Sequence, residues 1–313
     1  MAGSIRGSAM TEARGTGAAS AWATGGGRGE SGWRVQWRRM PRVRRWLTGA
    51  GAGVVAACLL IAVLAPVLFW ERALAMRTEA LLRGPSWDHP LGTDQFGRDL
   101  LSRVLVGARP SMLVAFGAVG LATLLGATVG VAVGYAGGVA DHLVLRVADV
   151  LFAFPGLLLA MAVMAVMGPS LGNLTAVLGL VYTPQFVRVA RAAALTVRSE
   201  QYVEAARALG ASELRILARH VAPNAMPPIL VQVSLSLSLA VLSESAVSFL
   251  GLGVQPPVPS WGNMLSEGRR FMEVAPWNAV APGVAMAVVV LGFNLLGDGL
   301  QELFDPRGRR EVV

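Results

Sequence analysis

Six long apolar segments, separated by polar stretches, dominate residues 47–313. A helix rises ~1.5 Å per residue, so segments of this kind can cross a hydrocarbon core ~30 Å thick. We therefore expect an all-α polytopic membrane protein with six transmembrane helices. The predicted spans are residues 48–69, 111–135, 143–167, 174–189, 225–250 and 274–297.

The longest polar interruption, residues 190–223, has the local pattern of a helix, a turn and a second helix. Residues 199–209 are rich in good helix formers. Gly210 then suits a left-handed stop, and Ser212 suits an N-cap with Glu213 in the first turn. We expect a short amphipathic helix on a sharp turn between two spans, a shape that another protein can bind.

The composition excludes a soluble protein and several enzymatic functions. Hydrophobic residues make up 54% of the chain, its mean hydropathy is +0.56, and only 15% of residues are charged, whereas soluble domains have ~25%. All 27 basic residues are arginine. Because a P-loop needs a lysine on the nucleotide phosphates, the chain lacks a standard ATPase site, and Schiff-base chemistry is excluded for the same reason. The single cysteine, Cys58, rules out an intrachain disulfide.

The basic N-terminal region favours a membrane surface over nucleic acid as its partner. The net charge is +8, and residues 33–46 interleave arginine with tryptophan. Such a pattern can bind single-stranded nucleic acid, but directly before an apolar span it is more typical of an anchor to membrane lipid. We expect residues 1–46 to form a largely disordered cytoplasmic tail with a membrane-surface anchor, and no nucleic-acid partner.

The distribution of arginine predicts the orientation in a cell membrane. Nine arginines face two acids in residues 1–47, and six face three in residues 188–219. Residues 71–110, with six arginines and five acids, and residues 255–277, with two of each, are nearly neutral. Because basic loops stay inside, we expect both termini and residues 190–223 in the cytoplasm and residues 71–110 outside.

Two motifs resemble catalytic or metal sites but have simpler explanations. Residues 168–172 match the Gly-x-Ser-x-Gly nucleophile pattern around Ser170, yet they lie between two predicted spans, where a turn is expected. The spacing of His89, Asp94 and Asp99 matches no standard set of metal ligands. We expect no catalytic residue, no cofactor and no bound metal.

The polar loop carries a recognisable motif. Glu204, Ala205, Ala206, Gly210 and Pro223 match the pattern Glu-Ala-Ala, three residues, Gly, then nine residues to Ile-x-Leu-Pro. This stretch resembles the cytoplasmic EAA loop of the inner-membrane permease subunits of ATP-binding cassette importers. The final Ile and Leu of the pattern are His and Ala here, and a His followed by Pro-Asn resembles the peptide and nickel branch of that family.

Two further motifs extend the resemblance to about residues 47–310. Residues 89–99, His-Pro-Leu-Gly-Thr-Asp-Gln-Phe-Gly-Arg-Asp, are similar to the outer segment of dipeptide, oligopeptide and nickel permeases, and residues 244–262 resemble the same branch almost residue for residue. Residues 183–188 keep the proline and arginine of the family's Trp-Pro-x-Tyr-Ala-Arg but lose its Trp and Tyr. Pro110 stands where another residue is usual, and it suits the first turn of the next span.

The resemblance implies the type I permease fold of these importers for residues 47–313. It implies four kinds of partner: a second homologous permease subunit, two cytoplasmic ATPase subunits, an external substrate-binding protein and membrane lipid. The subunit itself would be non-catalytic and would most resemble those for dipeptides or oligopeptides, while nickel chelates and glutathione stay open as substrates. The residues implied to couple to the ATPases are Glu204, Ala205, Ala206, Leu209, Gly210 and Ser212.

Polar groups inside the predicted spans are candidates for function. An intramembrane carboxylate is costly, so Glu244, with Ser248 one turn further, either pairs helices or lies in the translocation pathway. Arg146 and Asp149 are expected to pair at i, i+3 near the inner end of the third span, which Pro155 should kink.

Gly126, Gly130 and Gly134 recur at i, i+4 and i+8 in the second span. They form one smooth ridge, which serves either packing within the chain or contact with a second permease. The alternative for the whole chain is a stand-alone secondary transporter, which would need inverted repeats. We find no internal repeat.

Overall fold

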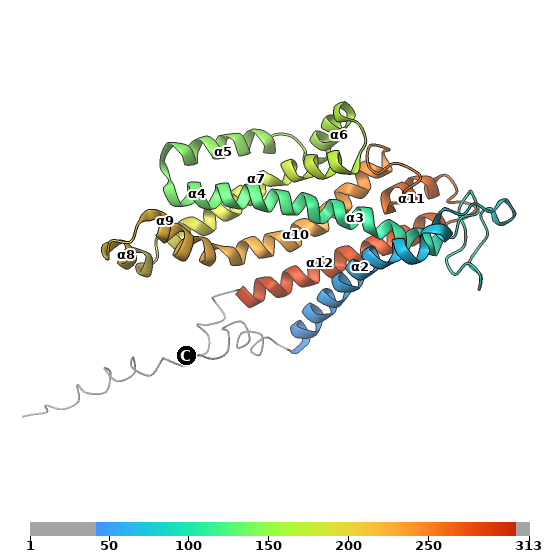
Figure 1. Ribbon diagram of the computed structural model, residues 1–313, viewed down its shortest axis with the longest axis horizontal. Coiled ribbons are helices and arrows are strands. Elements are labelled where there is room, and N and C mark those ends of the chain that lie inside the picture. The colour runs from blue at the N-terminus through green and yellow to red at the C-terminus, as the bar shows by residue number, and fades with distance from the viewer. Residues whose placement is uncertain (1–41, 305–313) are drawn as a thin grey trace, which may run out of the picture. The chain divides into compact units, whose positions relative to one another are not determined.

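The computed structural model describes residues 42–304, in which every regular element is helical (Figure 1). Residues 1–41 of the region expected to be a cytoplasmic tail with a membrane-surface anchor, and the C-terminal arginines, lie outside the described residues, whereas residues 42–46 form the start of α2. The elements are α2 (Arg42–Leu74), the 3₁₀ turn η1 (Thr78–Ala80), α3 (Leu100–Ala122), the π-helical turn η2 (Thr123–Ala127), α4 (Thr128–Ala136), α5 (Gly138–Phe152), α6 (Gly156–Met167), α7 (Leu171–Arg198), α8 (Gln201–Ala208), α9 (Glu213–Ile216), the π-helical turn η3 (Leu217–Val221), α10 (Ala222–Phe249), α11 (Trp261–Arg269) and α12 (Trp277–Phe304).

Four helical stretches in the described part of the chain are long and apolar enough to cross a membrane. They are α2, the continuous stretch from α3 through η2 to α4, the stretch from α9 through η3 to α10, and α12. A fifth is added if α5 and α6, which are bent by 82° at their junction, count as one span. By length and composition alone, α7 does not qualify, because polar and arginine residues interrupt its apolar face.

The structure corrects two expectations about proline. Pro155 does not kink one third span but separates two helices, since α5 ends at Phe152 and α6 begins at Gly156. Pro110 lies inside α3 instead of in its first turn, because that helix begins at Leu100. The polar segment between the first two spans is therefore residues 75–99, shorter than the predicted 71–110.

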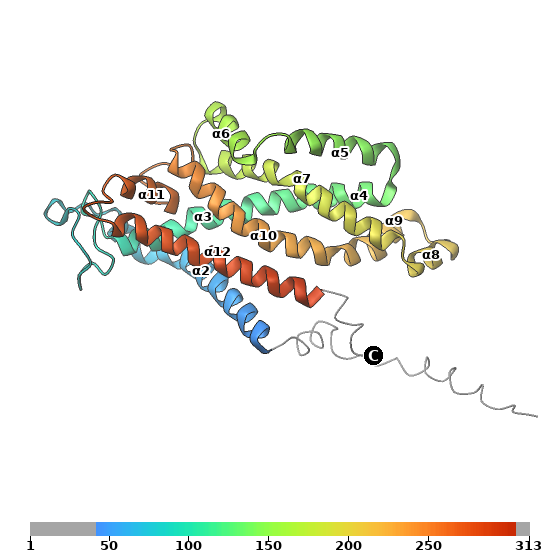
Figure 2. The same ribbon diagram turned by 180° about the vertical axis from the view of Figure 1, so that it is seen from behind.

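Helix α7 lies in the middle of the bundle and packs against α3, α4, α6 and α10, while α2 packs against α3 and α12. Phe186 and Leu174 of α7, Ile229 of α10 and Phe293 of α12 are completely or almost completely buried in this core. Helices α8 and α9 lie at one end of the bundle, and α11 lies with the polar segment at the other end (Figure 1, Figure 2). The two polar regions singled out by the sequence thus face opposite ends.

The glycine ridge packs within the chain. A Cβ added at Gly126 would lie 2.6 Å from the carbonyl oxygen of Thr183, and one at Gly130 would lie 2.4 Å from that of Val187. At Gly134 the nearest atom would be the carbonyl oxygen of Arg191, at 2.7 Å. The ridge is therefore the surface on which α7 approaches the η2–α4 stretch, and small residues allow the two backbones to come this close.

Candidate functional site

The α8–α9 loop forms the helix, turn and helix that the sequence predicts. Gly210 has φ +81°, and its N–H donates to the carbonyl of Arg207 at 3.0 Å, which confirms the left-handed stop. Ala211 N–H donates to the carbonyl of Ala206 at 3.1 Å. Ser212 has the extended backbone of an N-cap, although its side chain makes no capping hydrogen bond.

The loop buries one face and exposes the other. Val203 and Ile216 are completely buried and fix the two short helices against the bundle. On the outside, Leu209 is 88% exposed and Leu214 is 75% exposed, and Glu204 beside them is exposed as well. Large apolar side chains that flank a sharp turn in this way are typical of a surface that another protein covers.

A cluster of polar side chains connects this loop to the end of α4. The Tyr135 hydroxyl donates to the carboxylate of Glu213, and Arg207 Nε donates to the same carboxylate at 3.1 Å. Hydrogen bonds to Glu213 and to Tyr135 raise the pKa of the Arg207 guanidinium, which stays charged. Sequence reasoning missed Tyr135, because nothing local to it signals a partner that lies 78 residues away.

Helix α5 is held to α7 by two ion pairs. Asp141 accepts two hydrogen bonds from Arg191, and Asp149 accepts one from Arg188 at 2.6 Å. The Arg188 guanidinium also lies 4.1 Å from the ring centroid of Phe152. The predicted pair of Arg146 with Asp149 is wrong, because the carboxylate is directed to the neighbouring helix and Arg146 is exposed.

Glu244 is completely buried between α10 and α3. Its carboxylate accepts hydrogen bonds from Ser111 at 2.9 Å, from Ser248 at 2.8 Å and from Ser245 at 3.1 Å. Ser248 Oγ in turn accepts from the N–H of Val254 at 3.2 Å. Of the two roles open to Glu244, this geometry favours helix pairing, because the group is enclosed within the chain's own core.

The polar segment 75–99 is organised by the motif His-Pro-Leu-Gly-Thr-Asp-x-x-Gly-Arg-Asp. Gly92 and Gly97 have φ of +82° and +72°, and a Cβ at the second would lie 1.9 Å from the carbonyl oxygen of Arg77, so glycine is required. Asp94 accepts the N–H groups of Phe96 at 2.8 Å and Arg98 at 2.9 Å. The glycines and the aspartate of the motif thus make the turns.

Four charged side chains lock this segment onto the bundle. Asp94 pairs with Arg98 at 2.6 Å and with Arg103 of α3 at 3.3 Å, and Glu267 of α11 lies 3.2 Å from Arg103. Both arginines and the aspartate are at most 5% exposed. Removing one member would leave a buried charge without its partner, a change that typically costs about 3–5 kcal/mol.

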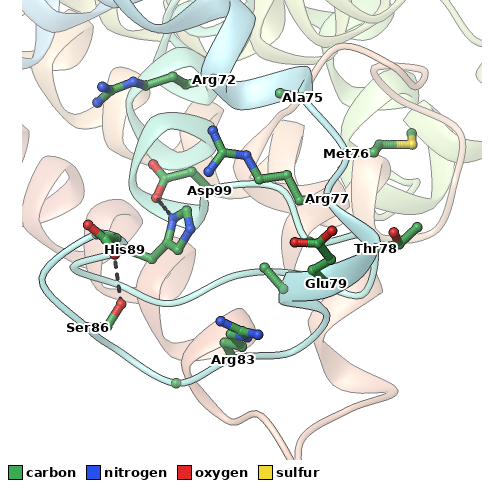
Figure 3. Close-up of a pocket in the computed structure, with 14 residues that line it drawn as sticks. Arg72, Ala75, Met76, Arg77, Thr78, Glu79, Arg83, Ser86, His89 and Asp99 are labelled. Carbon is green, nitrogen blue, oxygen red and sulfur yellow. Dashed lines mark hydrogen bonds and ion pairs between the residues drawn. The ribbon is translucent and has the colours of Figure 1, made fainter.

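An open pocket of about 780 Å³ lies between the end of α2 and the polar segment 75–99 (Figure 3). Its lining includes Arg72 in the last turn of α2, Arg77 just before η1 and Arg83 just after it, and Glu79 lies beside Arg77. None of the three arginines has an ion-pair partner among residues 42–304. The pocket is therefore suited to acidic or zwitterionic groups from outside the chain.

The side chains of the two motifs that resemble metal or catalytic sites have other partners. His89 Nδ1 lies 2.9 Å from Asp99 Oδ1, and Asp99 also caps α3 by accepting the N–H of Ser102 at 2.9 Å. Asp94 belongs to the ion cluster instead, so the three residues do not converge on one point. Ser170 caps α7 by accepting the N–H of Asn173 at 3.0 Å and lies in a turn between helices.

Residues 122–310 match the family described as "Binding-protein-dependent transport system inner membrane component". The chain belongs to this family. The match includes the α8–α9 loop and Glu244, whereas the polar segment 75–99 precedes it. As a member of this family, the chain is a membrane component of a transport system. Its several long apolar helices agree with a multi-pass membrane protein.

Individual relatives of this transport component extend the match to most of the chain. It is 40% identical over 277 residues to the dipeptide transport system permease protein DppC of Alkalihalophilus pseudofirmus, covering 88% of this chain and 90% of that one. It is 39% identical over 282 residues to the glutathione transport system permease protein GsiD of Pectobacterium atrosepticum, covering 88% and 91%. The probable D,D-dipeptide transport system permease protein DdpC of Escherichia coli is 39% identical over 261 residues, covering 83% and 88%.

Proposed function

We propose that this chain is the membrane-spanning permease subunit of an ATP-driven importer for short peptides. The observation that carries the proposal is the α8–α9 loop, in which a glycine turn with φ +81° presents two exposed leucines at one end of the bundle. The names of the relatives specify dipeptides, D,D-dipeptides and glutathione. Together they support short peptides as the substrate class.

The loop docks onto a cytoplasmic ATPase subunit. Leu209 and Leu214 enter an apolar groove of that subunit, and Glu204 on the same exposed side meets a basic group at its rim. When the two ATPases close on ATP, they carry the loop with them and rock the bundle between outward-facing and inward-facing states. The chain contributes movement and a pathway, formed with a second homologous permease, and no covalent chemistry.

The chain crosses the membrane six times with both termini in the cytoplasm. In this topology α7 is the fourth span although it is only moderately apolar, because its polar residues face other helices of the bundle and α5 pairs with its arginines. Residues 75–99 then lie outside, where the unpaired arginines of the pocket receive acidic side chains of the substrate-binding protein.

Co-purification with tagged ATPase subunits tests this function. Glu204→Lys and Leu209→Asp should each remove most of the captured ATPase and abolish uptake, while the level of permease in the membrane stays normal. Glu273→Lys, a reversal of an exposed acid between α11 and α12 at the other end of the bundle, is the matched control and should capture ATPase normally. Wild-type capture by both loop variants would show that the loop is an ordinary solvated surface.

Uptake assays with radiolabelled dialanine and with radiolabelled glutathione identify the substrate. Cells that lack their other peptide importers should accumulate at least one of the two only when the permease, both ATPases and the binding protein are present. Accumulation that persists without the ATPases would instead indicate a secondary transporter.

A further inference from the structure

Tyr135 lies where the second span meets the α8–α9 loop. It occupies the last turn of α4, which is followed by the C-cap Gly137 with φ +69°. The side chain is only 8% exposed, and its hydroxyl reaches beyond its own helix to donate to Glu213. The same hydroxyl accepts from Arg207 Nη2 at 3.3 Å. One phenol therefore contacts both short helices of the loop.

The contacts close a triangle across the glycine turn. Arg207 is in α8 and Glu213 is in α9, on either side of Gly210, and Arg207 Nε donates to Glu213 at 3.1 Å. Tyr135 is the corner that belongs to the bundle, so it joins the turn as a unit to α4. The backbone at the same position is fixed separately, because Arg198 at the end of α7 donates to the carbonyl oxygen of Tyr135 at 2.7 Å.

We propose that Tyr135 is the positioning residue that transmits movement of the α8–α9 loop to the second span. This role rests on the proposed function of the loop. Without the hydroxyl, Arg207 and Glu213 still pair with each other, but that pair lies within the loop and no longer connects it to α4. The loop would then follow the ATPases while the span lags behind.

The first test uses hydrogen exchange of the permease alone in lipid nanodiscs. Tyr135→Phe keeps the ring and the backbone contact and removes only the hydroxyl. Amides of residues 203–216 should exchange about tenfold faster, because the loop loses a hydrogen bond that involves charged groups. Tyr182→Phe is the matched control, since the Tyr182 hydroxyl donates to Ser243 inside the bundle at 2.9 Å. Unchanged exchange in Tyr135→Phe, or an equal rise in both variants, would overturn the proposal.

The second test measures coupling in the complete complex in proteoliposomes, with whichever of dialanine and glutathione gives the higher wild-type uptake. Tyr135→Phe should capture ATPase and hydrolyse ATP at the wild-type basal rate, yet transport about tenfold fewer peptides per ATP. The double variant Tyr135→Phe/Glu213→Gln should transport about as many peptides per ATP as Glu213→Gln alone, since both changes break the same triangle of contacts.

Three outcomes contradict this role: a wild-type ratio of peptide to ATP, full additivity with Glu213→Gln, or loss of ATPase capture by Tyr135→Phe, which would make the residue part of the docking surface. The proposed function fails separately. It depends on capture by Glu204→Lys and Leu209→Asp, two variants that leave Tyr135 and its contacts in place.

Discussion

Replacing Gly210 by valine perturbs one backbone angle and nothing else. The residue has φ +81°, and a Cβ built on it would meet no atom within 4 Å. The cost is therefore conformational, at about 1–2 kcal/mol for a side chain held at positive φ. That free energy corresponds to a roughly 5- to 30-fold shift away from the native turn. Since only the native turn presents both leucines together, we expect Gly210→Val to weaken ATPase binding by up to this factor, the limit reached when the strained turn is a minor conformation.

The measurement is the dissociation constant of the purified ATPase subunit on permease nanodiscs. Gly168→Val is the matched control, because Gly168 has φ +83°, also meets no atom within 4 Å, and ends α6 far along the chain from the loop. The Gly168→Val variant has the same backbone strain, but outside the docking turn, and should bind ATPase normally. Equal affinities for Gly210→Val and wild type, or equal losses in the two valine variants, would refute the reasoning.

Three further predictions concern the bundle and its orientation. Gly130→Ala should lower the melting temperature in detergent, at a cost of about 1–3 kcal/mol for overpacking against α7, whereas Gly120→Ala, which meets no atom within 4 Å, should not. Glu244→Leu should destabilise the fold on the order of 2 kcal/mol by leaving its serine donors without an acceptor, and Glu244→Gln by less; equal melting points would contradict this. In a background without the native cysteine, a cysteine replacing Trp87, which is fully exposed, should react with an impermeant reagent on intact cells. A cysteine replacing Leu209 should react only after lysis, and labelling from outside would reverse the orientation.

Much of the helical architecture is predictable because it depends on local chemistry. Apolar runs mark four of the spans: α2 and the α3–α4 stretch contain the predicted segments, and α10 and α12 cover them except for residue 250 and residues 274–276. Gly210 is found at positive φ because a glycine that follows a run of helix formers commonly ends the helix in the left-handed conformation. Gly92 and Gly97 of the polar segment 75–99 are also found at positive φ, because the residues around them favour turns.

The errors arise where long-range contacts override local pattern. Helix α3 begins eleven residues earlier than the apolar run because Arg103, which looks incompatible with a buried helix, is neutralised by Asp94 and by Glu267, a residue 164 positions away. Asp149 pairs across to α7 instead of along its own helix for a similar reason. Such partners are set by tertiary packing, and periodicity carries no information about them.

The π-helical turn η2 has a consequence for how insertions and deletions act on this bundle. A π turn holds one residue more than an α turn, so it offsets the sequence phase of α4 from that of α3 by about 100°. Leu124 lies within that turn and is 68% exposed, so it can be deleted without removing a buried side chain. A chain shortened there by one residue would form an uninterrupted α-helix whose later glycines still face α7. A relative that lacks the bulge should therefore carry its glycine ridge one position earlier in register.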